Sequence, residues 1–415
     1  MLYTLKGGYV YTNKVLKKTN IIIENDKIIE ISDQEKGNIV DITGLYVAPG
    51  FIDPHVHMRE PGFVESETIK TGSHAAARGG YTKVFLMPNT SPVISSIEAY
   101  NNLLEIIKKD SIIECYPLVA ITKDELGKEL VNFEEFDCVG FSDDGRPVMN
   151  SYLMYQAMLK AKSLNKPILC HCEDLDLVNK GTFNNSVKQE NSSSLPNLDI
   201  SETTMVARDL VLALKTKAHY HVCHLATKES LDLVKFYKSI GCNVTVEVTP
   251  HHIVLNDEMI DITPNYKMNP PIRAKKDQEA LIEGIINGDV DMISTDHAPH
   301  SFAKKNKPID QSAFGIVGLE TSFALLYTKL VKSNLISVEK LFDLMSYNVA
   351  SKFNLSNNEI IVGNQASLVV LDLDHEFIID KSKFLSKSNN TPFDGWKCYG
   401  KVVKTICKGA VVYEA

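Results

Sequence analysis

Short apolar runs alternate with amphipathic, helix-like segments through the middle of the chain. Helix-like segments at residues 66–78 and 151–163 separate neighbouring runs, and the first stops at the helix-terminating pair Gly79-Gly80. This alternation predicts parallel strands joined by helical crossovers. The runs are residues 51–57, 82–88, 112–120, 138–143, 167–172, 220–226, 243–250 and 290–295. Eight parallel strands close a (β/α)₈ barrel, so we predict an α/β TIM-like barrel, with an open doubly wound sheet as the alternative.

Both ends of the chain are β-rich, in contrast to the middle. Residues 21–31 form two apolar runs around a polar turn, which predicts a β-hairpin. The tail repeats this pattern at residues 367–372 and 402–412. Neither end alone carries much of a core. We therefore predict a small β-sandwich domain formed by both termini, residues 1–48 plus 360–415, beside a barrel domain of residues 49–359.

Composition narrows the class of protein. The chain has 415 residues, 44% hydrophobic and 23% charged, which is ample for a large globular core. The net charge of -8, from 44 basic and 52 acidic residues, disfavours nucleic acid and anionic membranes as partners. The start lacks a signal-peptide pattern, and no apolar run approaches the roughly 18 residues that cross a bilayer. Eight scattered cysteines indicate reduced thiols, so we expect a cytoplasmic protein.

The first apolar run ends in a His-x-His pair, His55 and His57. Side chains two apart on an extended segment point to the same face. Two neutral imidazoles on one face make a pair of metal ligands. A single His-x-His motif is equally compatible with two histidines on a loop. Its interpretation therefore depends on the residues at the other strand ends.

Histidine or aspartate recurs at five of the eight predicted strand ends, where the active site of a barrel lies. Six nitrogen and oxygen donors exceed what one tetrahedral zinc needs, and they suit two ions that share a bridging carboxylate. The absence of thiolate ligands fits a hydrolytic site, where a metal ion polarises a carbonyl and lowers the pKa of bound water toward about 7. The candidate donors are His55, His57, Asp144, His171, His224 and Asp296.

Strand alternation assigns faces to residues near these donors. On the sixth strand, His224 shares a face with Tyr220 and Val222. His219 and His221 then face the other way, and we interpret them as structural.

The fifth and seventh strands offer alternative ligands. If His171 faces the barrel mouth, Cys170 and Cys172 face the helices, which favours buried thiols over a Cys-x-Cys zinc site. His251 and His252 follow the seventh strand and stay open as alternative metal ligands.

Six motifs lie at these positions and extend over nearly the whole chain: DPHVHMREPG at 53–62, MPNT at 87–90, FSDDG at 141–145, HCED at 171–174, KMNPPIR at 267–273 and TDHAPH at 295–300. By these motifs the chain resembles the amidohydrolase superfamily, and within it the class I dihydroorotases.

The resemblance implies a site for two zinc ions per subunit. By motif position, one ion is held by His55, His57 and Asp296, the other by His171 and His224, and Asp144 bridges them. Many relatives use a carboxylated lysine as the bridge, whereas the Asp-Asp-Gly sequence here matches the class I branch. Spacing alone leaves open whether Asp143 or Asp144 is the bridge.

The implied reaction is the reversible cyclisation of N-carbamoyl-L-aspartate to L-dihydroorotate in de novo pyrimidine biosynthesis. In the hydrolytic direction a metal-bound hydroxide attacks the ring amide, and Asp296 carries the proton to the leaving nitrogen. Arg59 lies on the same side as the ligands and can pair with the substrate carboxylate. Family position adds substrate contacts from His57, Asn89, Asn269, His300, Phe314 and Gly315.

Two other functions stay open. The first is another cyclic amidase, such as a hydantoinase or allantoinase, although these usually carry the bridging lysine. The second is a non-catalytic homologue that serves as a scaffold for aspartate transcarbamoylase, although such relatives have typically lost metal ligands. Among partners, we expect the small-molecule substrate and a homodimer, and neither nucleic acid nor a membrane. The sequence leaves open whether the protein also associates with aspartate transcarbamoylase.

Overall fold

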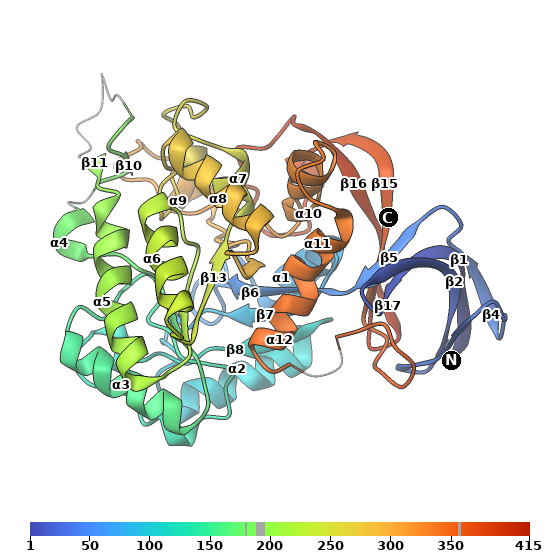
Figure 1. Cartoon of the computed structure of the whole chain (residues 1–415), viewed down its shortest axis with the longest axis horizontal. Helices are drawn as coiled ribbons and strands as arrows, with labels where there is room; N and C mark the ends of the chain where they lie inside the picture. Colours follow the sequence, from blue (N-terminus) through green and yellow to red (C-terminus); the bar gives the residue numbers. More distant parts are fainter. Residues whose placement is uncertain (179–180, 188–195, 356–357) are drawn as a thin grey trace.

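The computed structural model describes residues 1–178, 181–187, 196–355 and 358–415. In this part of the chain, parallel strands form a barrel in sequence order, the architecture that the sequence predicts (Figure 1). Its strands are β6 (Phe51–Val56), β7 (Tyr81–Leu86), β8 (Glu114–Pro117), β9 (Ile168–Cys170), β12 (Tyr220–Val222), β13 (Val244–Val248) and β14 (Met292–Ile293). The predicted fourth strand, residues 138–143, is reduced to one bridging residue, Phe141, which pairs with Val119 and Ile168. A bridge between Val56 and His297 closes the ring.

Apart from β8, the barrel strands are buried on both faces, which explains why they read as continuous apolar runs. All six residues of β6 and of β7 are buried. One face packs against the outer helices, while the interior is filled by side chains such as Ile52, Phe85, Leu169 and Met292. Phe353 joins the same interior cluster. The barrel is therefore a packed core that presents its strand ends at the mouth.

Capping side chains fix where several of the helices begin. Thr68 caps α1 in a capping box with Thr71, which is why the helix predicted from residue 66 begins at Ile69. The predicted helix at 151–163 is α3, capped by Asn150. The helices are α1 (Ile69–Arg78), α2 (Ile97–Asp110), α3 (Ser151–Ser163), α4 (Leu175–Val178), α5 (Ile200–Thr216), α6 (Lys228–Ser239), α7 (Pro250–Val254), α8 (Lys275–Asn287), α9 (Phe302–Lys305), α10 (Ser322–Leu326), α11 (Val338–Phe342) and α12 (Asn348–Lys352). Over the described ranges, no helix combines the length and apolarity needed to cross a membrane.

Strands from both ends of the chain share one sheet, as predicted, at the right of Figure 1. The two halves meet where β5 pairs with β15, with Val47 opposite Val370. The predicted hairpin is β2–β3. The sheet has the order β17-β16-β15-β5-β1-β2-β3, with β4 beside β1: β1 (Leu2–Thr12), β2 (Val15–Glu24), β3 (Lys27–Ser32), β4 (Asn38–Asp41), β5 (Tyr46–Pro49), β15 (Leu368–Ile378), β16 (Lys397–Cys407) and β17 (Ala410–Glu414). Two short strands outside it, β10 (Phe183–Asn184) and β11 (Pro196–Asn197), pair with each other.

The C-terminal segment between β15 and β16 returns to the barrel. Ser388 Oγ donates to Ser66 O at 2.7 Å, and Asn390 Nδ2 donates to Gly315 O at 3.0 Å near the barrel mouth. At the other end, β5 leads into β6 through the single residue Gly50. The division of the chain at residues 48 and 360 stays a prediction.

Candidate metal centre and adjoining pocket

Four of the predicted metal ligands meet at the end of β6. His55 Nε2 lies 3.4 Å from Asp144 Oδ1 and 3.6 Å from Asp296 Oδ1. His57 Nε2 lies 3.4 Å from Asp144 Oδ2 and 3.2 Å from Asp296 Oδ1. The two carboxylates come from distant parts of the chain, and the barrel brings them to the same pair of imidazoles.

The two remaining predicted ligands adjoin this group. His224 Nε2 lies 3.8 Å from Asp144 Oδ1 and 2.9 Å from His171 Nδ1. His171 Nε2 in turn lies 3.3 Å from Glu173 Oε2 and 3.1 Å from Asn269 Nδ2. Asp144 therefore stands between the two halves of the predicted donor set.

The donor atoms fit a divalent metal ion. His55 Nε2 and Asp144 Oδ1 are buried and have no hydrogen-bond partner in the described part of the chain, a condition that native proteins rarely tolerate. The atoms of His55, His57 and Asp296 lie within 4.8 Å of one another, as do those of His55, Asp144 and His224. Imidazole nitrogens and carboxylate oxygens are ligands that zinc and similar ions accept.

Both carboxylates of the cluster are ionised at neutral pH. Burial raises the pKa of Asp296, but the hydrogen bond with His57 and the charge of His55 lower it to about 2. Burial also raises the pKa of Asp144, but the neighbouring His55 and His224 hold this pKa well below its usual range. The cluster thus offers anionic oxygens, which metal binding and proton acceptance both require.

Glu247 on β13 is a buried carboxylate that the sequence analysis missed. Its Oε1 lies 3.0 Å from His55 Nδ1 and accepts the backbone N–H of His224 at 3.1 Å, while Oε2 lies 3.0 Å from His221 Nε2. When His55 Nδ1 donates to Glu247, Nε2 carries the lone pair that a metal needs. The available signal was an acidic residue in the apolar run Val-Thr-Val-Glu-Val.

The faces predicted for the sixth strand are wrong. Tyr220 and Val222 pack in the core shared with the helices, whereas His221 points to Glu247. The strand β12 ends at Val222, and His224 has a φ of 33°, in the left-handed region. Strand alternation therefore stops before His224, and the turn, not the pleat, aims this side chain into the cluster.

Unusual backbone conformations recur at the site. Arg59, His224 and Asp296 have φ values of 60°, 33° and 47°, a region that side-chain-bearing residues rarely adopt. The pairing of β6 with β7 also shifts register between Asp53 and Val56, as in a β-bulge that re-aims the following side chains. Strain of this kind concentrates where side chains must be aimed at a ligand.

The structure separates the two aspartates that spacing left open. Asp143 Oδ1 accepts the N–H groups of Ile121 at 2.7 Å and Thr122 at 3.0 Å, and Oδ2 accepts the Thr122 hydroxyl. These bonds hold Asp143 away from the histidines. Asp144 is the one that faces them.

The alternative ligands lie outside the cluster. Cys170 and Cys172 are buried in the core shared with the helices, and Cys172 Sγ lies 3.1 Å from Tyr220 OH. All eight cysteines are unpaired. His251 is buried against His252, with ring centroids 4.5 Å apart, and it joins none of the three-donor groups found among the described residues.

A pocket of about 240 Å³ opens beside the donors. Ligand pockets for larger, drug-sized molecules start at about 300 Å³, so this one suits a small metabolite. Every residue predicted to contact substrate lines it, namely His57, Arg59, Asn89, Asn269, His300, Phe314 and Gly315. Asp144, His171, His224 and Asp296 line the same pocket.

Arg59 faces the pocket without an acidic partner within salt-bridge distance among the described residues. Its Nε donates to Pro299 O at 3.1 Å. Burial lowers the pKa of Arg59 to about 10, so the guanidinium stays charged at neutral pH. His300 Nε2 lies 3.4 Å from Arg59 Nη2 but 2.5 Å from Phe314 O. A ring nitrogen that donates to that carbonyl cannot accept from Arg59, so most of the guanidinium N–H groups remain for an anionic ligand.

Asn89 orients two of the donors in addition to lining the pocket. Its Oδ1 lies 2.9 Å from His57 Nδ1, and its Nδ2 donates to Asp144 Oδ2 at 3.2 Å. Fixing His57 Nδ1 as a donor turns Nε2 toward the cluster.

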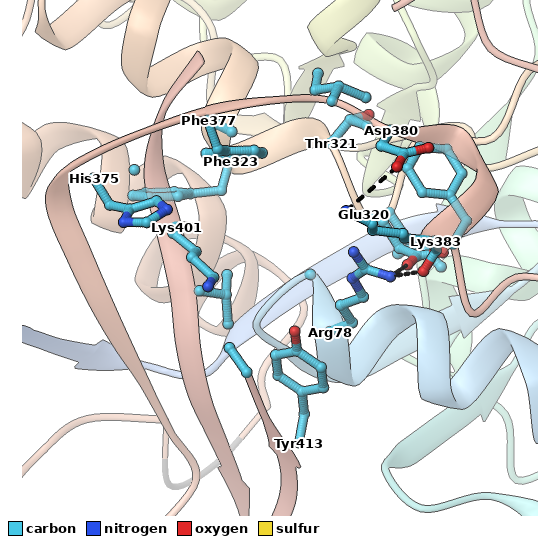
Figure 2. A pocket seen from close by; sticks show the side chains of 18 of the residues that line it. Arg78, Glu320, Thr321, Phe323, His375, Phe377, Asp380, Lys383, Lys401 and Tyr413 are labelled. Carbon is cyan, nitrogen blue, oxygen red and sulfur yellow. Dashed lines mark hydrogen bonds and ion pairs between the residues drawn. The ribbon is translucent and has the colours of Figure 1, made fainter. Parts of the chain in front are cut away.

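A second cavity of about 280 Å³ lies at the junction of the barrel and the terminal sheet (Figure 2). Arg78 and Glu320 line it from the barrel, while His375, Phe377 and Lys401 line it from β15 and β16. No predicted site residue lines this cavity. The candidate chemistry therefore belongs to the pocket at the barrel mouth.

A known family and known proteins resemble this chain over nearly its whole length. The model of the amidohydrolase family matches residues 46–412. A dihydroorotase from Fusobacterium nucleatum is 46% identical over 415 residues, covering 99% of this chain and 98% of that protein. A dihydroorotase from Listeria monocytogenes is 44% identical over 423 residues, covering 100% of this chain and 99% of that protein.

Among solved structures, the L-hydantoinase (dihydropyrimidinase) from Arthrobacter aurescens superimposes with a TM-score of 0.90 at 23% identity, covering 100% of this chain and 96% of that one. At this identity the likeness shows the fold alone. The family match and the dihydroorotase relatives show more: the chain belongs to the amidohydrolase family.

Proposed function

We propose that this chain is a dihydroorotase, which interconverts N-carbamoyl-L-aspartate and L-dihydroorotate in pyrimidine biosynthesis. The observation that carries the proposal is the unpaired Arg59 beside the buried donor cluster in one small pocket. The substrate has a carboxylate and a cyclic amide, and the pocket offers a partner for each. Relatives named dihydroorotase match the whole chain at 41–46% identity.

The proposal includes two zinc ions per subunit. His55, His57 and Asp296 would hold one ion and His171 with His224 the other, with Asp144 between them. The buried, unpartnered atoms His55 Nε2 and Asp144 Oδ1 support a metal at this point. When bound, such ions polarise the amide carbonyl and lower the pKa of a water molecule toward about 7.

Asp296 is the proposed proton carrier. Its low pKa keeps the carboxylate ionised, so it can accept a proton from the attacking water. It lines the pocket and can then hand the proton to the leaving ring nitrogen. In the cyclisation direction it accepts the proton of the ureido nitrogen instead.

The other pocket residues bind and orient the substrate. The guanidinium of Arg59 pairs with the substrate carboxylate, and the amides of Asn89 and Asn269 also line the pocket. Burial and the charge of Arg59 lower the pKa of His300 to about 2, so His300 acts as a neutral hydrogen-bonding group. His57 and the main chain of Phe314 and Gly315 complete the proposed set.

The test is to measure dihydroorotate ring opening together with the metal content of the purified protein. We expect activity with bound zinc, loss of activity after chelation, and loss of turnover in both directions for Asp296→Asn. Hydantoin and allantoin, assayed side by side, should be poorer substrates. Faster turnover of either would favour the other cyclic amidases, and a stable metal-free protein without activity would favour the scaffold.

The proposal extends to location and assembly. The unpaired cysteines support a reducing compartment such as the cytoplasm. By resemblance, we propose a homodimer that associates with aspartate transcarbamoylase. Light scattering of the protein, alone and mixed with the transcarbamoylase, measures both masses. A monomer that stays separate would contradict this part.

A further inference from the structure

Two walls of the pocket are tied together by buried lysines that the proposed mechanism does not use. One wall is the segment 267–273, which carries Asn269. The other is the loop of residues 309–317, which carries Phe314 and Gly315. Because both walls lack regular strands or helices at these residues, their separation depends on the individual contacts that join them.

Lys305, the last residue of α9, donates all of its side-chain hydrogen bonds to backbone carbonyls. Its Nζ donates to Lys267 O at 2.9 Å, Ala313 O at 2.9 Å and Gly315 O at 2.7 Å. An ammonium group has three donors, so none is left over. The residue is 4% exposed. One side chain thus connects the first wall with two points on the loop.

Lys267 makes the complementary connection. Its Nζ donates to Ile309 O at 2.6 Å and lies 4.4 Å from the centre of the Phe314 ring. Its carbonyl accepts the N–H of Gly315 at 3.0 Å. The residue is 2% exposed. The loop is therefore held near both of its ends.

We propose that Lys267 and Lys305 form a lysine clamp, a pair of positioning residues that hold the Phe314–Gly315 loop at the distance from Asn269 that the substrate requires. The inference rests on the proposed function and adds two residues to that site. Burying an ammonium group is costly unless every hydrogen finds an acceptor. Here the acceptors all belong to pocket walls, so the burial fixes the shape of the pocket.

The clamp acts on substrate binding rather than on the reacting atoms. The pocket residues that the two ammonium groups contact are Phe314 and Gly315, neither of which is a proposed metal donor. Lys305→Met keeps an unbranched side chain, one atom shorter, and removes the three donors. We expect it to raise KM for dihydroorotate by about tenfold, with kcat and zinc content within about twofold of wild type.

The neighbouring Lys304 is a matched control. Its side chain is 41% exposed and pairs with Glu65 at 2.7 Å, outside the pocket. Lys304→Met should leave KM unchanged. Lys267→Met should raise KM as Lys305→Met does. The KM of the double variant should be about the same as that of either single variant, because both lysines hold the same loop.

Amide hydrogen exchange tests the clamp without relying on activity. In Lys305→Met, the amides of residues 309–317 should exchange faster than in wild type and in Lys304→Met. Unchanged exchange, or faster exchange with an unchanged KM, overturns the proposal. If Lys305→Met does not fold, Lys267→Met is measured in its place, since it leaves the three bonds of Lys305 intact. If the zinc-loaded wild type does not turn over dihydroorotate, the proposed function fails, while the exchange result still decides whether the clamp exists.

Discussion

At the scale of single residues, the orientation of His55 and His57 in the cluster depends on what their second ring nitrogen, Nδ1, binds. His55 Nδ1 is held by Glu247, and His57 Nδ1 is held by Asn89. Each contact leaves Nε2 facing the carboxylates of the cluster. Residues outside the donor set therefore decide whether the donors can act together.

The first prediction concerns Glu247. Glu247→Gln keeps the size of the side chain but removes the charge that orients His55 and His221. We expect the metal affinity to fall about 10- to 100-fold, the usual cost of losing such an outer contact. Competition with a chromogenic chelator measures it. Glu202→Gln is the control, because Glu202 accepts the N–H groups of Ala226 and Thr227 and does not orient a proposed metal ligand. Equal metal affinities in the two variants would contradict the role of Glu247.

A second prediction concerns Arg59. Arg59→Met should raise KM for dihydroorotate about 10- to 100-fold, because hydrogen bonds to a charged group contribute roughly 1.5–3 kcal/mol. Zinc content should stay unchanged. Arg78→Met is the control, since Arg78 lines the other cavity and pairs with Glu320 at 3.2 Å. An unaltered KM in the Arg59 variant would remove this residue from carboxylate binding.

The sequence reveals the candidate metal ligands more readily than the residues that orient them. The six candidate ligands could be found because each stands at or just beyond a predicted strand end. Glu247 could not be assigned to His55, because that contact joins β13 to β6, two strands that do not pair with each other. The face of His221 was predicted wrongly because alternation was extended to His224, beyond the end of β12.

At the scale of elements, the ends of strands and helices carry the conformations that regular structure cannot supply. The helix α5 is capped at its C-terminus by Lys217, whose φ of 56° is left-handed and whose N–H donates to Ala213 O. This turn leads into β12 and so toward His224. A residue with a side chain is strained in this conformation, where glycine is not.

Lys217→Gly should therefore stabilise the protein. We expect the free energy of unfolding to rise by about 0.5–1 kcal/mol, because the bond to Ala213 is kept and the strain is removed. Lys215→Gly, two residues earlier inside the helix, should lower it by about 1 kcal/mol. Urea unfolding of both variants measures the difference. A loss of stability in both would mean that the left-handed residue is not strained.

The predicted fourth strand shows where pattern reasoning stops at this scale. Residues 138–143 have the apolar composition of a buried strand, yet only Phe141 bridges its neighbours. The carboxylate of Asp143 binds the N–H groups of Ile121 and Thr122. A side chain thus replaces part of the backbone ladder, and the apolar pattern of a run contains no sign of that exchange.

At the scale of the whole molecule, the sequence indicated that both termini build one β-rich unit but not how that unit meets the barrel. Apolar pattern identifies strands, whereas the junction depends on contacts between residues far apart in sequence. Val369 and Leu371 of the terminal sheet pack in one apolar cluster with Phe323 of α10, and polar contacts add to this packing. Glu320 accepts the N–H groups of Leu385 at 2.9 Å and Ser386 at 3.0 Å, and it pairs with Arg78 beside the junction cavity (Figure 2). The same C-terminal segment supplies Asn390 to the pocket loop.

The junction should make stability depend on pH through Glu320. Burial raises the pKa of Glu320 from 4.5 to about 7, in spite of its N–H partners and Arg78. Between these values the folded protein holds a proton that the unfolded chain has lost. The stability from this group is therefore complete below about pH 4.5 and is lost as pH rises through 7, on the order of 3 kcal/mol in all.

Glu320→Gln removes this titration and keeps an oxygen for the N–H groups of the C-terminal segment. Between pH 5 and 7 we expect the variant to lose less stability than wild type as pH rises, as measured by urea unfolding at a series of pH values. Glu283→Gln, on the exposed side of α8, should keep the wild-type slope. Parallel curves for wild type and Glu320→Gln would mean that Glu320 is already ionised at pH 5, and that the charged pair with Arg78 outweighs its burial at the junction.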